Sequence, residues 1–387
     1  MNQVYYWNRV CPTKFGTGAS ETIGDDAKAM GFSRVMLCTE QALMDFGIAT
    51  KVQERLKDAG LEVFVYAACV PDAPSEVCDA GAAFARENNV DGIVAVGGGS
   101  TMDTAKAVGI ILSMGGTTIA DYYHIPEPEH KIRLIAIPTT SGTGSENSPG
   151  AVIRDAETGR KEIPVYKANL ALVDPVLTYT VPASVTAATG LDVLAHAAEA
   201  ITNRNFNAYG NIFAKEAIRL TMKYLKTACE KPDDVEAREK MAFASNLAGL
   251  AMAECGCSIG HTFSQTFAAM NHIPHGLGCA WALPSCMTYT ARYGTREDLA
   301  ETADAFGITV SDADDAEAIA KKIADILVAF MKELKVVSIK EKGYTLEDCL
   351  KATELFQYDA AYANAPGTPL SDDEIRAYIR ETYEMYQ

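Results

Sequence analysis

The sequence predicts two domains of different class: an α/β domain with a parallel sheet over residues 1–181, and an all-α domain over residues 182–387. Up to residue 173, short runs rich in β-branched residues alternate with helical patterns, which is typical of strand–helix–strand units in a parallel sheet. From Pro182 onward the apolar residues recur with helical spacing, and no strong strand pattern is left. A chain of 387 residues also suits two domains better than one.

The individual elements follow from the same patterns. In the first, Rossmann-like domain we expect strands at residues 34–39, 61–66, 92–96, 133–137 and 170–173, and helices at residues 42–60 and 74–89. A further helix should follow the glycine-rich turn after residue 96, with Ser100 and Thr101 as suitable N-cap residues. In the second domain we expect helices at residues 185–202, 208–230, 235–255, 258–270, 295–306, 316–334 and 346–354, and a turn at residues 273–276.

The charge and hydropathy of the chain argue against several kinds of partner. A formal net charge of −17 would repel a nucleic acid backbone or an anionic membrane. The apolar run at residues 107–114 is too short to span a bilayer, and no signal-peptide pattern is visible at the N-terminus. The ten cysteines are scattered without a disulfide framework, which indicates reduced thiols and predicts a cytoplasmic protein.

Four side chains of metal-binding type stand in the second domain: Asp192, His196, His261 and His275. A spacing of four residues places Asp192 and His196 on one face of a predicted helix. For that pair alone a solvated helix face is the commoner outcome, but the flanking residues are apolar, and buried polar groups need a partner. One carboxylate and three imidazoles suit a divalent transition metal such as Fe²⁺ or Zn²⁺.

Two turns rich in glycine and hydroxyl side chains follow predicted strands. Gly97, Gly98 and Gly99 lead into a helix, whose free N–H groups and positive dipole end would attract a phosphate. The spacing matches neither GxGxxG nor the Walker A motif, so a plain turn remains the alternative. The second turn, residues 138–146, carries five hydroxyl side chains and two glycines. Two such loops at the carboxyl ends of parallel strands point to a dinucleotide.

Glu40 follows the first predicted strand. A carboxylate at this strand end can accept hydrogen bonds from an adenosine ribose and would repel a 2′-phosphate, so it favours NAD over NADP. An exposed loop glutamate without such a role is the alternative.

Four segments together resemble the iron-containing (group III) alcohol dehydrogenase family, and the resemblance covers nearly the whole chain. They are residues 97–103 with Lys106, residues 138–146, residues 189–196 with Glu199, and His261 followed fourteen residues later by His275. Each motif alone would be weak, but four in the family's order are specific. The resemblance implies an NAD(P)-linked oxidoreductase that interconverts small alcohols and aldehydes and assembles as a homodimer or larger homo-oligomer.

The resemblance also implies roles for single residues. It implies a metal, iron more than zinc, in a cleft between the domains, held by Asp192, His196, His261 and His275. The dinucleotide would contact Glu40, Gly98, Gly99, Ser100, Asp103, Thr139, Thr140, Thr143, Lys161 and Leu177. At the catalytic centre His261 and His275 would hold the ion, and His272 is a candidate proton relay.

Two departures from the family pattern bear on the reaction. Gln265 stands where many members carry a second histidine near the nicotinamide, so no single histidine is marked for proton transfer. Residues 147–150 differ from the family's usual sequence beside the substrate pocket, so the family does not specify the alcohol.

Two other hypotheses stay open: a glycerol dehydrogenase or dehydroquinate synthase-like metal enzyme of the same two-domain plan, and a non-catalytic metal-binding protein. The ligand set fits the iron type better than the first. The two glycine-rich loops argue against the second, because metal storage needs no nucleotide site. The favoured prediction is a metal-dependent, NAD-linked oxidoreductase acting on a small primary or hydroxy-substituted alcohol.

Overall fold

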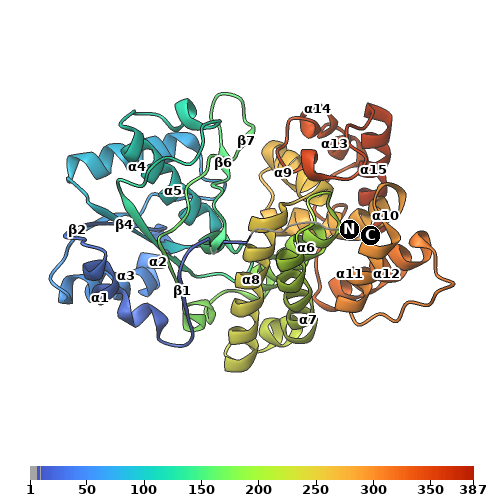
Figure 1. The fold of residues 1–387 in the computed structure, drawn as a ribbon, viewed down its shortest axis with the longest axis horizontal. Helices are drawn as coiled ribbons and strands as arrows, with labels where there is room; N and C mark the ends of the chain where they lie inside the picture. The colour runs from blue at the N-terminus through green and yellow to red at the C-terminus, as the bar shows by residue number, and fades with distance from the viewer. Residues whose placement is uncertain (1–6, 9) are drawn as a thin grey trace. The chain divides into compact units, whose positions relative to one another are not determined.

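The computed structural model describes residues 7, 8 and 10–387, which form two compact units (Figure 1). One unit spans Asn8–Thr180, and the other comprises Trp7 and Val181–Gln387. The first contains a parallel sheet with helices, and the second is helical. The predicted fold class is therefore confirmed.

The α/β unit is built on a six-stranded parallel sheet with the order β1-β8-β5-β4-β2-β3. Its strands are β1 Thr13–Phe15, β2 Arg34–Cys38, β3 Glu62–Tyr66, β4 Gly92–Gly97, β5 Arg133–Pro138 and β8 Leu170–Val173. All five expected strands are present. The sixth strand, β1, was not expected, because its three residues are exposed and carry no apolar pattern. The central strand β4 is buried along its whole length, as a sheet covered on both faces requires.

Helices cover both faces of this sheet. α1 (Ile23–Ala29) and α3 (Ile48–Asp58) share an apolar core with alternate residues of β2 and β4, since successive strand side chains point to opposite faces. α4 (Ser75–Glu87) and α5 (Gly99–Met114) lie on the other side of the sheet (Figure 1). The remaining elements are α2 Gln41–Asp45, the antiparallel pair β6 Ile153–Arg154 and β7 Lys161–Glu162, and the 3₁₀ turns η1 Ala19–Thr22, η2 Ile119–Tyr122, η3 Ser145–Asn147 and η4 Pro175–Thr178.

Two expectations for this unit were wrong. The single helix expected at residues 42–60 is two helices, α2 and α3, because Gly47 between them adopts a left-handed conformation with φ of +76°. The N-cap of α5 is Gly98 rather than Ser100 or Thr101, so both hydroxyl residues lie in the first helical turn. Their side chains instead bond neighbouring segments: Asp72 N donates to Ser100 Oγ at 3.1 Å, and Thr101 Oγ1 donates to Glu40 Oε1 at 3.0 Å.

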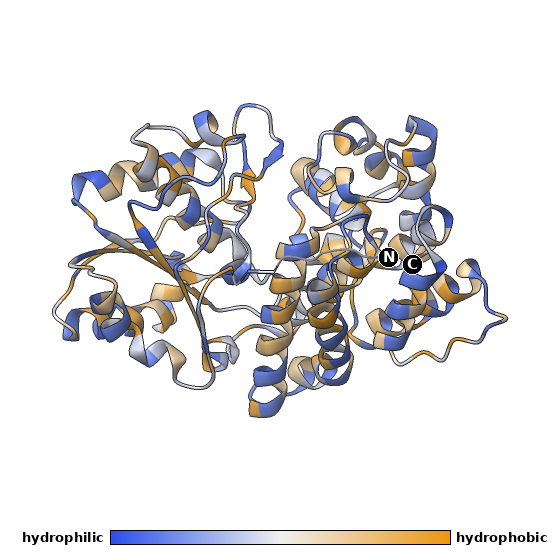
Figure 2. Cartoon of the chain, in the orientation of Figure 1, coloured by the Kyte–Doolittle hydropathy of each residue, from blue (hydrophilic) through white to orange (hydrophobic). Residues whose placement is uncertain are grey.

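The second unit is a bundle of helices around one apolar core. They are α6 Ala183–Thr202, α7 Ala208–Glu230, α8 Val235–Cys255, α9 Ile259–Asn271, α10 His275–Tyr293, α11 Arg296–Ala305, α12 Ala316–Glu333, α13 Leu346–Leu350, α14 Thr353–Phe356, α15 Asp372–Met385 and the 3₁₀ turn η5 Tyr362–Asn364. The sheet strands are coloured apolar along much of their length, whereas the helices mix hydrophobic and hydrophilic residues (Figure 2). α6 differs from the other helices in its burial, because all of its residues from Gly190 to Thr202 are buried.

The helical predictions are confirmed except at three places. Residues 346–354 form α13 and α14 rather than one helix, and neither α10 nor α15 was predicted as a helix. The turn expected at residues 273–276 is wrong as well, because His275 is the first residue of α10. Pro274 is the N-cap of that helix, a region of the chain where proline costs no hydrogen bond.

Among the described residues, no helix combines the length and the apolar character that crossing a membrane requires.

The two glycines at the end of β4, Gly97 and Gly98, differ in the space around them, and this difference can be tested by substitution. A methyl group on Gly97 would lie 2.4 Å from Thr101 Oγ1 and 2.5 Å from its Cβ, whereas one on Gly98 would meet nothing closer than Thr140 Oγ1 at 3.6 Å. Thr101 is fully buried and branched at Cβ, so it cannot swing away. We therefore expect Gly97→Ala to lower the free energy of unfolding by about 1–3 kcal/mol, and Gly98→Ala to change it by less than about 0.5 kcal/mol. Thermal and urea unfolding of both variants measure this, and equal losses would contradict the close approach at Gly97.

Candidate functional site

Glu40 and the glycine-rich turn lie at neighbouring strand ends of the parallel sheet. From β2 the chain adds β3 on one side and then β4 on the other, so the strand order reverses between β2 and β4. Glu40 follows β2, and Gly98 and Gly99 follow β4. Doubly wound sheets bind ligands outside the carboxyl ends of the strands at such a point. The topology thus brings these predicted residues to the edge where this class of sheet binds ligands.

The two glycine-rich loops lie against each other. Thr139 N donates to Gly97 O at 3.0 Å, and a methyl group on Gly99 would lie 2.8 Å from Thr143 Cγ2. The Thr140 side chain is likewise the nearest group to Gly98. The first turn of α5 is therefore lined by backbone N–H groups and threonine side chains, a surface that suits a phosphate or pyrophosphate.

Asp103 joins α5 to the second loop. Its carboxylate accepts a hydrogen bond from Ser145 Oγ at 2.8 Å and lies 3.5 Å from Lys106 Nζ. Lys106 is fully buried and also donates to Gly150 O at 2.7 Å. Burial raises the pKa of Asp103, although Lys106 acts in the opposite direction. Asp103 therefore holds the loop in place, and its predicted contact with a dinucleotide remains a prediction.

Two further residues predicted to bind the dinucleotide also have partners within the unit. Lys161 in β7 forms an ion pair with Asp72, whose backbone N–H bonds to Ser100. Leu177 in η4 packs against the apolar core beneath the sheet. A link from Lys161 through Asp72 to Ser100 keeps the lysine beside the start of α5.

The helical unit brings the four predicted metal ligands together around one oxygen atom. Asp192 Oδ1 lies 3.6 Å from His261 Nε2, 3.8 Å from His275 Nε2 and 3.8 Å from His196 Nδ1. These separations are too long for good hydrogen bonds. They are close to the spacing of ligands around a shared ion, because two ligands at about 2.1 Å from a tetrahedral metal stand about 3.4 Å apart. Among the described residues the donor atoms of Asp192, His261 and His275 form one group, whereas His196 is grouped only with His261 and Cys257.

Three helices position these side chains. Asp192 and His196 lie one turn apart on α6, His261 lies on α9, and His275 opens α10. The start of α10 can approach α6 because its second residue is Gly276. A methyl group there would lie 2.5 Å from a backbone carbonyl oxygen of α6, four residues before Asp192.

The burial of the donor atoms fits a bound cation. The side chains of Asp192, His196 and His261 are nearly inaccessible to solvent, whereas that of His275 is 36% exposed. Asp192 Oδ1, His196 Nδ1 and His261 Nε2 are buried without a hydrogen-bond partner among the described residues. Buried polar atoms of this kind are costly unless something binds them. A divalent transition metal would satisfy all three at once.

Glu199 orients His261, a role that the sequence analysis missed. The Glu199 carboxylate is fully buried and accepts hydrogen bonds from the backbone N–H groups of Ser258 and His261. Its Oε2 also lies 3.1 Å from His261 Nδ1. A carboxylate on one ring nitrogen fixes the imidazole so that the other nitrogen faces the ion. Glu199 stands three residues after His196, so helical spacing could have placed it on the same face.

The electrostatics of the site favour positive charge. Burial alone would raise the pKa of Asp192, but the three imidazoles around it, first that of His196, hold the pKa well below its usual value. Burial would lower the pKa of His196, yet Asp192 raises it overall. The pKa of His261 is also raised against the effect of burial, first by Cys257. The same field that favours a protonated imidazole favours a divalent cation in its place.

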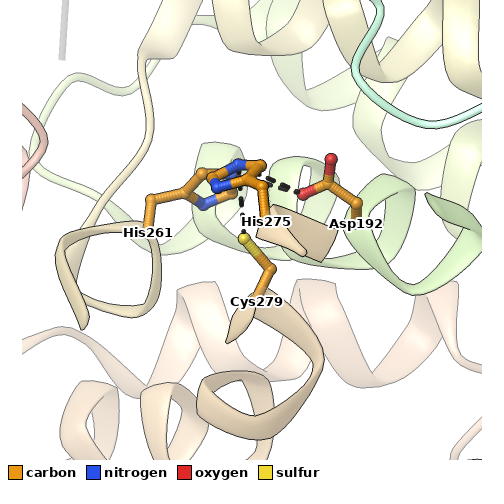
Figure 3. A group of neighbouring side chains, drawn as sticks. All are labelled: Asp192, His261, His275 and Cys279. Carbon is orange, nitrogen blue, oxygen red and sulfur yellow. Dashed lines mark hydrogen bonds and ion pairs between the residues drawn. The ribbon is translucent and has the colours of Figure 1, made fainter. Parts of the chain in front are cut away.

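Two thiols that the sequence analysis did not assign to the site also lie in it. Cys279 Sγ is 3.5 Å from His275 Nε2, and its donor atom lies within 4.8 Å of those of Asp192, His261 and His275 (Figure 3). Cys257 forms a similar group with His196 and His261. Burial raises the pKa of Cys279 to about 12, so the thiol is protonated at neutral pH when no cation is bound.

The structure does not bring His272 into either group of donor atoms within the described chain. His272 is exposed and ends α9 in a left-handed conformation with φ of +50°. Gln265 lies one turn after His261, and its Oε1 is buried without a hydrogen-bond partner among the described residues. The proton-relay role of His272 therefore remains a prediction with only sequence proximity behind it.

Comparison with known proteins adds independent evidence. The family model "Iron-containing alcohol dehydrogenase" matches residues 12–175, and the model "Fe-containing alcohol dehydrogenase family, C-terminal" matches residues 186–383. A choline dehydrogenase from Bacillus subtilis (strain 168) is 36% identical over 337 residues, which cover 85% of this chain and 83% of that protein. An NAD-dependent methanol dehydrogenase from Bacillus methanolicus is 33% identical over 301 residues, with coverage of 76% and 78%.

Solved structures of known enzymes share the fold of this chain as well. A crystal structure of 1,3-propanediol oxidoreductase superposes with a TM-score of 0.90 and 26% identity, covering 98% of this chain and 100% of that one. Both units therefore have counterparts in a single solved enzyme. The chain belongs to the iron-containing alcohol dehydrogenase family of oxidoreductases, as its four motifs predicted.

Proposed function

We propose that this enzyme interconverts a small primary or hydroxy-substituted alcohol and its aldehyde by hydride transfer to and from NAD. The observation that carries the proposal is the placement of three imidazole nitrogens 3.6–3.8 Å from one buried carboxylate oxygen. Choline, methanol and 1,3-propanediol, which name three of the relatives, each carry a primary hydroxyl group. That shared group supports the substrate class but does not specify one alcohol.

Asp192, His196, His261 and His275 would hold the divalent cation, Fe²⁺ by preference, which when bound polarises the oxygen of the alcohol or aldehyde as a Lewis acid. The chain itself fixes the geometry. α6 holds Asp192 and His196 one turn apart, and Glu199 holds the ring of His261. The partial exposure of His275 gives the substrate access to the ligand set.

The dinucleotide would lie on the α/β unit, with its pyrophosphate at Gly98, Gly99 and Ser100. The threonines of the second loop would line it, and Glu40 would accept hydrogen bonds from the adenosine ribose. The nicotinamide supplies the hydride chemistry, and the protein aligns the cofactor and excludes water. Gln265 has no titratable proton, so we propose that the alcohol proton leaves through water or hydroxyl groups.

A panel of small alcohols tests the proposal directly. The protein loaded with Fe²⁺ should form NADH from at least one primary alcohol and consume NADH with the matching aldehyde. No turnover of any member in either direction would overturn the proposed activity while leaving the family assignment intact.

We expect Asp192→Ala and His275→Ala to lose both bound metal and turnover while the fold survives. Each change removes a ligand, and Asp192 also supplies the negative charge at the centre of the set. Metal content by elemental analysis, measured beside activity and circular dichroism, checks this. His124→Ala is the matched control, because that imidazole is 85% exposed and belongs to the other unit. Full turnover by a variant without bound metal would refute the mechanism.

The preference for NAD should depend on the charge of Glu40. Glu40→Gly and Glu40→Gln should both raise the use of NADP relative to NAD by roughly tenfold, equivalent to about 1.4 kcal/mol. Glu40→Gln tests charge alone, because its amide oxygen can still accept the hydrogen bond that Thr101 donates to Glu40 Oε1. The ratio of kcat/KM values for the two cofactors measures the effect. A wild-type enzyme that favours NADP would show that Glu40 does not face the ribose.

The identity of the working metal can be tested by removing and replacing it. Zn²⁺ binds most nitrogen and oxygen sites more tightly than Fe²⁺, so iron must be selected by geometry and supply. After chelation and anaerobic reloading we expect Fe²⁺ to restore more activity than Zn²⁺, and the iron-loaded enzyme to lose activity in air and recover with ferrous iron and a reductant. Full, air-stable activity with zinc alone would make this a zinc enzyme.

A further inference from the structure

We propose that Asp192, His261, His275 and Cys279 form a second, closed coordination set that binds Zn²⁺ in an inactive form of the enzyme. The inference rests on the proposed function, because it concerns the same pocket. It differs from the iron-type set in one exchange: the thiol of Cys279 replaces the imidazole of His196. Figure 3 shows the four side chains converging from α6, α9 and α10.

The distances suit a small tetrahedral ion. Cys279 Sγ lies 3.5 Å from His275 Nε2, and Asp192 Oδ1 lies 3.6 Å from His261 Nε2 and 3.8 Å from His275 Nε2. Zinc bonds of about 2.0 Å to nitrogen or oxygen and about 2.3 Å to sulfur separate neighbouring ligand atoms of a tetrahedron by about 3.3–3.6 Å. All four donor atoms lie within 4.8 Å of one another, so small rotations of the side chains complete the set.

Helix geometry favours this thiol. Cys279 is four residues after His275 on α10, so both side chains project from one face of the same helix. Cys279 is fully buried, and among the described residues His196 is not grouped with it. His196 instead forms its own group with Cys257 and His261. The two groups share His261, and only the group with Cys279 contains the Asp192 carboxylate.

The chemistry of the two sets differs. A thiolate is a soft ligand that favours Zn²⁺ over Fe²⁺, whereas histidine and carboxylate ligands with open positions are typical of Fe²⁺ sites. Four protein ligands complete a tetrahedral zinc site and leave no position for the oxygen of an alcohol. When the sulfur–zinc bond forms, the thiol proton passes to solvent. Zinc bound in this way would block the reaction that iron supports.

Cobalt provides the test, because Co²⁺ replaces Zn²⁺ and gives a near-ultraviolet charge-transfer band only when a thiolate is bound. We would load the full chain with one equivalent of Co²⁺ under anaerobic conditions and record the spectrum and the metal stoichiometry. The wild type should show the band, and Cys279→Ser should lose it while still binding cobalt. Cys286→Ser is the matched control: this cysteine is buried on the same helix but belongs to neither donor group, so the band should persist.

Zinc affinity and zinc-supported turnover give a second readout. Cys279→Ser should weaken Zn²⁺ binding by at least roughly tenfold, with a smaller change for Fe²⁺. The zinc-loaded variant should also turn over faster than the zinc-loaded wild type, because serine leaves a coordination position open. Equal zinc affinity and equal zinc-supported turnover in the two proteins would overturn the proposal.

The outcomes separate this inference from the proposed function. If the wild type binds one Co²⁺ that Asp192→Ala abolishes but shows no thiolate band, the closed set is refuted and the metal site stands. If Cys257→Ser rather than Cys279→Ser removes the band, the thiol comes from the other group and the proposal is also refuted. If the wild type binds no cobalt at all, both the metal site and the closed set fail.

Discussion

The buried carboxylate of Asp192 is the constraint that sets how the candidate metal site is arranged. An ionised carboxylate inside an apolar core is costly unless opposite charge and hydrogen bonds compensate it. Here the compensation comes from imidazoles on three different helices, so α6, α9 and α10 must converge on one point. Glu199 adds a second buried carboxylate and makes the need for positive charge greater. The convergence of these three helices therefore serves both purposes: it compensates the buried carboxylates and it places the imidazoles where they could hold a cation.

The α/β unit recognises its ligand by different means. Its predicted binding surface is made mostly of backbone N–H groups and small hydroxyl side chains, and glycine lets the chain turn within contact distance of neighbouring threonines. Few of these residues bury apolar area, so the loops are held by polar links instead. The buried group of Asp103, Lys106 and Ser145 is such a link, and the ion pair of Lys161 with Asp72 is another.

The sequence predicts elements well where one strong pattern controls them. α7 and α8 begin and end at the predicted residues, and each begins after an Asn or Asp whose side chain accepts a hydrogen bond from a backbone N–H of the first turn. The break at Gly47 was missed because a glycine inside a helical pattern is compatible with continuation. α15 was missed because most of its residues are charged or polar, and only Ile375, Tyr378, Ile379 and Thr382 form its buried face. None of these errors changes the order of the strands or the class of either unit.

The candidate metal site was predicted only in part, because the sequence marks residue types but not contacts that depend on the fold. Asp192, His196, His261 and His275 could be selected by residue type, and the structure brings them together. Cys279 could not be selected once residues 273–276 were taken as a turn, because its relation to His275 exists only if both lie on one helix. The role of Glu199 could have been inferred from helical spacing. The approach of Cys257 to His196 depends on tertiary packing and has no local signal.

The unequal exposure of the four ligands has a kinetic consequence. Three of them are enclosed by the bundle, and of the four only His275, the first residue of α10, meets solvent. An ion can therefore enter or escape past this one side chain without unfolding the bundle. The lifetime of the bound ion would then follow the opening of a single helical turn, and the composition of the medium, as much as intrinsic affinity, would decide which ion the enzyme carries.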